Sequence, residues 1–223
     1  MKEKIASLRE RYRSDVRFRV NASLHWNFWL NIAYALLQLG LGYMHHTVWY
    51  YSLAGYHAIL AFMRFFLMRY SSKHEIREDV KKEWKLYRFC GIMLFGLNVT
   101  LAGFVYYIMW QGRAFVHHEI TVIAMAAYTF YMFTMSVISF NKYRKLKSPV
   151  YTAGRMIGLA TALVSMLTLE KAMLATFGAA DGEEFRLIMT GATGAGVTVL
   201  VLGMAIYMVV VANRRLKGFK VKE

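Results

Sequence analysis

LIMTGATGAGVTVLVLGMAIYMVVVA, residues 187–212, contains no charged side chain and runs directly into Asn213, Arg214 and Arg215. An α-helix rises about 1.5 Å per residue, so this stretch is long enough to cross a hydrocarbon layer of about 30 Å. A run of this kind that stops at basic residues predicts a transmembrane helix ending at a membrane surface.

The same pattern recurs along the chain, and 57% of the 223 residues are hydrophobic. Five further apolar runs of spanning length cover residues 24–44, 48–68, 89–110, 120–140 and 151–177. We therefore expect an all-α polytopic membrane protein with six transmembrane helices. The expected organisation is a basic N-terminal segment (1–23), a six-helix transmembrane domain (24–213) and a basic tail (214–223).

The distribution of lysine and arginine predicts the orientation of these six helices. Seven, seven, four and five of the 28 basic residues lie in segments 1–23, 69–88, 142–147 and 214–223. With six spans these four segments fall on one side of the membrane, and basic connections stay in the cytoplasm. We expect both termini to be cytoplasmic, in a membrane such as the bacterial inner membrane, whose proteins have compact loops.

The net charge of +15 is accounted for by this orientation, and no recognised nucleic-acid motif accompanies it, so nucleic acid is not an expected partner. The glycine-rich residues 191–196 lie inside an apolar run and not between a strand and a helix, which excludes a dinucleotide cradle. Cys90 is the only cysteine and cannot form an intramolecular disulfide. No catalytic constellation is present, so we do not expect an enzyme.

Polar side chains inside the expected spans are candidates for a functional role. Asn27, Asn31 and Gln38 in the first span recur at four and seven residues and share one helix face, while His57 lies near the middle of the second span. The fifth span carries Glu170, the only acidic residue inside a span. The transport-path candidates are Asn31, Gln38, His57, Thr161, Ser165 and Glu170. Hydrogen bonding between helices is the alternative role for each of them.

A second group of polar residues lies in the expected outer loops. It consists of His45, His46, His117, His118 and Glu119, which come from two different helical hairpins. Imidazole and carboxylate suit a divalent ion such as zinc, although no motif with metal-ligand spacing is present. We expect no cofactor beyond such a divalent cation, and a plain polar cap is the alternative.

The first hairpin, NIAYALLQLG (31–40) followed by GYMHHTVWYYSLAGYH (42–57), resembles the opening hairpin of the cation diffusion facilitator family. The last span, GVTVLVLGMAIY (196–207) with its basic exit, is also similar to that family's final helix. The resemblance implies six spans with both ends inside, a homodimer, and cation transport. The small-residue faces of the last two spans also permit a homodimer.

The chain departs from the family's transport site, which uses Asp or His residues four apart on the second and fifth helices. Here the second helix offers His57 without a carboxylate, and the fifth offers Thr161 and Ser165 at that spacing. Hydroxyls are poor zinc ligands. The basic segment 214–223 also leaves no counterpart of the family's soluble C-terminal domain, so we expect a changed substrate or a loss of transport.

Two functional hypotheses follow from the sequence. The first is a transporter-like protein that moves a cation or a small polar solute through the six-helix bundle. The second is a membrane sensor, scaffold or partner subunit that transports nothing and binds through its basic cytoplasmic loops. In both hypotheses the lipid bilayer is the primary partner.

Overall fold

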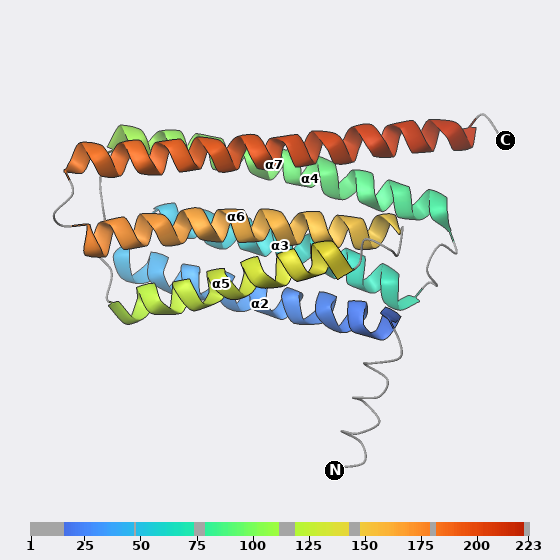
Figure 1. Ribbon diagram of the computed structural model, residues 1–223, viewed down its shortest axis with the longest axis horizontal. Helices are drawn as coiled ribbons and strands as arrows, with labels where there is room; N and C mark the ends of the chain where they lie inside the picture. Colours follow the sequence, from blue (N-terminus) through green and yellow to red (C-terminus); the bar gives the residue numbers. More distant parts are fainter. Residues whose placement is uncertain are drawn as a thin grey trace, which may run out of the picture. The chain divides into compact units, whose positions relative to one another are not determined.

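The computed structural model describes residues 16–46, 48–73, 79–111, 119–142, 148–178 and 182–220, and every regular element in these ranges is an α-helix (Figure 1). The helices, labelled as in Figure 1, are α2 (Val16–His45), α3 (Val48–Lys73), α4 (Val80–Gln111), α5 (Glu119–Lys142), α6 (Pro149–Phe177) and α7 (Glu183–Lys220). The all-α prediction is confirmed, and each expected apolar run lies within one helix.

Five of the six helices, α3 to α7, are long and apolar enough to cross a membrane. The exception is α2, which has ample length with 30 residues but no 18-residue stretch that is apolar enough for a candidate span. Its interior positions hold Asn27, Asn31 and Gln38, and three such side chains within four turns offset the neighbouring leucines. Length and composition therefore identify five candidate spans.

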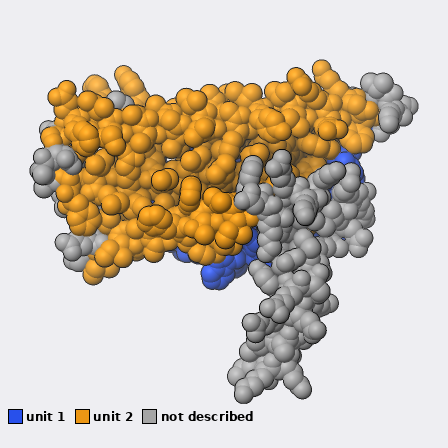
Figure 2. Space-filling view, in the orientation of Figure 1, with its two compact units in different colours: residues 1–83 blue, residues 84–223 orange. Residues whose placement is uncertain are grey.

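Two compact units make up the chain, residues 1–83 and residues 84–223 (Figure 2). In the first unit α2 packs against α3, and His46 ends α2 in the left-handed backbone region with a φ of 47°. The turn between the two helices is so short that they form a hairpin. Gly42 lies beside the Tyr51 ring, where a Cβ atom would be 3.2 Å from the ring carbons.

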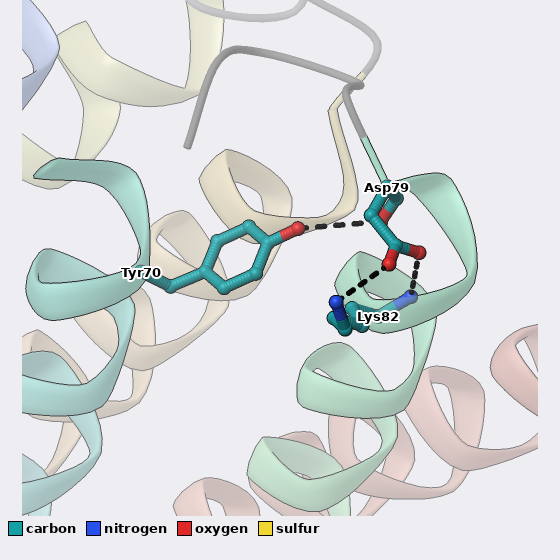
Figure 3. Close-up of polar contacts among 3 residues, drawn as sticks. All are labelled: Tyr70, Asp79 and Lys82. Atoms are coloured by element: carbon teal, nitrogen blue, oxygen red, sulfur yellow. Dashed lines mark hydrogen bonds and ion pairs between the residues drawn. The ribbon is translucent and has the colours of Figure 1, made fainter. Parts of the chain in front are cut away.

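The start of α4 is joined to the end of α3 by Asp79 (Figure 3). The Tyr70 hydroxyl donates a hydrogen bond of 3.2 Å to the Asp79 carbonyl oxygen. The Asp79 carboxylate accepts the Lys82 backbone N–H at 2.9 Å and forms an ion pair of 2.9 Å with the Lys82 ammonium group. A carboxylate that accepts an N–H in the first turn caps a helix, so Asp79 determines where α4 begins.

In the second unit α6 packs against both α5 and α7. Pro149, the only proline in the chain, occupies the first turn of α6. Proline is favoured there because the first N–H groups of a helix have no partner within the helix. α6 is also the most enclosed candidate span, because 61% of its apolar 18-residue stretch is buried, against 28% of the corresponding stretches of α5 and α7.

The α4 and α7 helices, which run side by side in Figure 1, pack antiparallel in one consistent register. A Cβ atom on Gly91 would lie 2.9 Å from the Met208 Cβ, and a Cβ atom on Gly194 would lie 2.7 Å from Val105 Cγ1. These two contacts are fourteen residues apart on each helix, which is four turns. Glycine at both positions permits this close approach of the two helices.

The helices extend beyond the expected boundaries of the membrane domain. α2 already begins at Val16 and α7 continues to Lys220, so the expected divisions at residues 23 and 214 both fall inside helices. The basic residues Arg214, Arg215 and Lys217 therefore lie on α7. Residues 1–15 of the N-terminal segment lie outside the described residues.

We predict that Gly91→Leu destabilises the second unit, because its side chain would collide with Met208 and with the Val209 backbone. Overpacking of this kind costs about 1–3 kcal/mol. The measurement is thermal unfolding of the detergent-solubilised protein. Gly96→Leu is the matched control on the same helix, since a Cβ atom there meets nothing within 4 Å. Equal melting temperatures for the two variants would contradict the α4–α7 contact.

Candidate functional site

The candidate site begins with a buried polar face on α2. Asn27, Asn31 and Gln38 are all buried, and the last two have no exposed surface. Tyr34 lies between them in the same helical spacing and is also buried, so the face continues over three turns. Tyr34 was not among the predicted site residues, although its position three residues after Asn31 and four before Gln38 is a signal that the sequence contains.

His57 of α3 meets this face directly. Its Nδ1 atom lies 3.4 Å from Asn31 Oδ1, and its ring packs edge-on to Tyr34, with ring centroids 4.7 Å apart and planes at 75°. An amide oxygen can only accept, so Nδ1 carries the proton in this contact and Nε2 is the acceptor nitrogen of the neutral ring. Two helices thus hold one histidine in a defined orientation.

Gln38 is the least satisfied polar residue of this face. Its side chain has no exposed surface, and neither Oε1 nor Nε2 forms a hydrogen bond with another protein atom. A buried amide without partners costs about 1–3 kcal/mol relative to a hydrogen-bonded one. Such a group calls for an explanation, and a polar molecule inside the helix bundle supplies one.

Arg64 extends the polar character of the hairpin along α3. It follows His57 by seven residues and therefore lies on the same helix face, and it is among the largest fully buried side chains. Sequence position near the end of a span gave no indication of this burial, because arginine at such a position commonly extends to the membrane surface.

The buried serine and threonine hydroxyls of α6 donate hydrogen bonds to backbone carbonyls of the same helix. Thr161 donates to the Ile157 carbonyl at 2.7 Å, Ser165 to the Thr161 carbonyl at 2.8 Å, and Thr168 to the Val164 carbonyl at 2.8 Å. The Ser165 carbonyl in turn accepts the Thr129 hydroxyl of α5 at 3.3 Å. Each of these hydroxyl protons is already engaged, and the Thr129 bond ties α5 to α6.

Glu170 lies nearer the other end of α6 and is partly exposed. Its Oε1 atom is buried without a hydrogen-bond partner among the described residues, although Glu170 lies near Thr193 of α7. The hydroxyl of Thr193 itself donates to the Met189 carbonyl at 2.8 Å. Because the Thr193 proton is already donated, it is not available to the Glu170 carboxylate.

The outer histidines fall largely outside the described residues. His46 is exposed, with its ring 6.2 Å from that of Tyr43, and the His45 and Glu119 side chains and residues 117–118 are not described. Within the described ranges no group of three or more His, Cys, Asp or Glu side chains could hold a metal ion. The outer metal site stays a prediction.

The path candidates divide between the two units. Asn31, Gln38 and His57 belong to the α2–α3 hairpin, whereas Thr161, Ser165 and Glu170 belong to the second unit. Within the hairpin the structure brings predicted residues of two helices into contact, at the Asn31–His57 pair.

The chain matches no protein-family model, and no curated protein is similar to it. The resemblance to the cation diffusion facilitator family therefore stays a prediction based on the residues quoted above.

We predict that Asn31 and His57 are energetically coupled. We compare the free energies of unfolding of Asn31→Leu, His57→Leu and the double variant in a double-mutant cycle. The loss in the double variant should differ from the sum of the two single losses by about 0.6 kcal/mol, the average for hydrogen bonds between membrane helices. The measurement is unfolding in mixed detergent micelles. Asn31→Leu combined with Thr168→Val, which lies in the other unit, provides the additive control; an additive Asn31–His57 pair would refute the contact.

Proposed function

We propose that α2 is a sixth transmembrane helix and that both termini lie in the cytoplasm. The support comes from residues 26–44 of α2, where the large exposed side chains are apolar or aromatic and include Trp26, Trp29, Leu36, Leu39 and Tyr43. The polar residues of that segment, Asn27, Asn31 and Gln38, are buried instead. Such a helix presents a lipid-compatible surface even though no 18-residue stretch of it is apolar enough for a candidate span. Six spans then place the four basic segments on one side, as in a bacterial inner-membrane protein.

We further propose that the protein is transporter-like and that the α2–α3 hairpin lines its path for a small polar solute or a cation. The single observation that carries this proposal is Gln38, a fully buried amide whose oxygen and nitrogen lack protein partners. Seven residues away on the same face, Asn31 contacts His57. A series of amide and imidazole groups buried in a membrane bundle is costly, and such groups commonly mark a pathway.

The composition of the hairpin favours a neutral polar solute over a cation. Neither α2 nor α3 contains an aspartate or glutamate, and α3 buries the positively charged Arg64. A permeating cation would gain no carboxylate partner from these two helices. Amide groups, in contrast, offer both donors and acceptors to a neutral solute.

The hydrogen bonds of α6 favour a packing role for Thr161 and Ser165. Because their protons are donated to carbonyls of their own helix, they have none to offer a solute. The same observation supports the second candidate function, a sensor, scaffold or partner subunit with a dry interior. In that case Gln38 would be a structural residue of the hairpin.

The test is flux into proteoliposomes. Wild-type protein, Gln38→Leu and Ser165→Ala should be reconstituted in parallel and offered a panel of labelled polyols, amides and monovalent and divalent cations, with and without a proton gradient. We expect uptake of at least one neutral polar solute, a loss of about tenfold or more in Gln38→Leu, and near wild-type uptake in Ser165→Ala.

Two outcomes would overturn the transport proposal. One is the absence of flux for every solute by a protein whose helix content and melting temperature show that it is folded. The other is flux that survives Gln38→Leu and is lost in Ser165→Ala, which would move the path from the hairpin to α6.

A further inference from the structure

The α4–α7 pair carries a second feature that the proposed path does not use. The Arg88 guanidinium donates a hydrogen bond of 3.3 Å from Nη1 to Asn213 Oδ1, across the two antiparallel helices. This bond identifies which faces of α4 and α7 lie on the same side of the pair. Residues that follow helical spacing from Arg88 and from Asn213 must flank one continuous surface.

On α4 this spacing selects apolar residues. Ile92, Phe95 and Val99 lie four, seven and eleven residues after Arg88, and all three are exposed, at 55%, 44% and 58%. They form a stripe that starts at a basic residue and continues for about three turns. At about 1.5 Å per residue it extends roughly 16 Å, close to the thickness of one hydrocarbon leaflet.

The matching stripe on α7 has the same order. Lys217 lies four residues after Asn213 and is exposed. Val210 and Ile206 lie three and seven residues before Asn213 and are also exposed. Because the helices are antiparallel, the two apolar stripes run in the same direction, away from the Arg88–Asn213 contact. The basic end is shared by Arg88 and Lys217.

No carboxylate of these helix segments neutralises the basic end. The α4 residues 84–111 and the α7 residues 185–220 contain neither aspartate nor glutamate. Along α4 the preceding acidic residues are Glu83, which is buried, and Asp79, whose carboxylate is engaged by Lys82 (Figure 3). Clustered cations next to an exposed apolar stripe are complementary to a molecule with an acidic head and a hydrocarbon chain.

We propose that this surface, defined by Arg88, Lys217, Ile92, Phe95, Ile206 and Val210, binds an anionic phospholipid. The headgroup phosphate contacts Arg88 and Lys217, and an acyl chain lies along the apolar stripes. A soluble acidic protein would match the charges but would leave the three apolar turns uncovered. The inference rests on the proposed membrane placement of α4 and α7, and it does not depend on transport.

The test is lipid retention by the purified protein, measured by native mass spectrometry in detergent with added phosphatidylglycerol or phosphatidylcholine of identical chains. We expect wild type to retain phosphatidylglycerol preferentially, and the double variant Arg88→Gln/Lys217→Gln to lose about tenfold or more in apparent affinity. Arg69→Gln/Lys73→Gln on α3 removes the same charge from two other exposed residues and should retain the lipid like wild type.

The apolar half of the site requires its own comparison. The double variant Ile92→Gln/Ile206→Gln should weaken the binding of phosphatidylglycerol. Its binding of glycerol phosphate, a soluble analogue of the headgroup, should be unchanged. Equal retention of both lipids by wild type, or full retention by Arg88→Gln/Lys217→Gln with unchanged melting, would overturn the proposal. Strong binding of an acidic peptide without lipid preference would identify a protein-docking surface instead. Lipid retention is measured without any transport. A failure of the transport assay would therefore not count against the lipid-binding proposal.

Discussion

The structure depends on one constraint: in a helix bundle built to lie in lipid, a polar side chain must face the protein and not the hydrocarbon. α2 shows how the chain meets it. Trp26, Trp29, Leu36 and Leu39 are exposed, whereas Asn31 and Gln38 are buried. The Asn31–His57 contact and the edge-on Tyr34 ring then tie α2 to α3. The hairpin is thus specified by its polar face as much as by its apolar one.

The second unit obeys the same constraint by a different arrangement. Thr161, Ser165 and Thr168 donate their protons to the backbone of α6, so these three hydroxyls stay buried without donating to another helix. The contact between α4 and α7 depends on glycine instead, because Gly91 and Gly194 let the two backbones approach closely. Among the predicted path residues, Gln38 is distinctive because its complete amide is buried and lacks protein partners. We therefore place the proposed path in the hairpin.

Much of the fold could be predicted, because span length and hydropathy are properties of contiguous residues. The inward face of α2 was also predictable from the four- and seven-residue spacing of Asn27, Asn31 and Gln38. Helix pairing was not: Gly91, Gly96 and Gly103 look alike in sequence, yet of these three only Gly91 meets another helix. Nor does sequence reveal whether a Ser165 hydroxyl faces a solute or its own backbone, since both are compatible with the same spacing.

The central claim, that α2 spans the membrane with its polar face inward, is tested most directly by a nitroxide scan of residues 27–39 in reconstituted bilayers. Collision rates with oxygen, which concentrates in the hydrocarbon, should oscillate with a period of about 3.6 residues. The account predicts maxima at Trp29, Leu36 and Leu39 and minima at Asn31 and Gln38. Uniform accessibility to a water-soluble nickel reagent along the whole segment, without oxygen maxima, would show that α2 lies outside the bilayer and would contradict it.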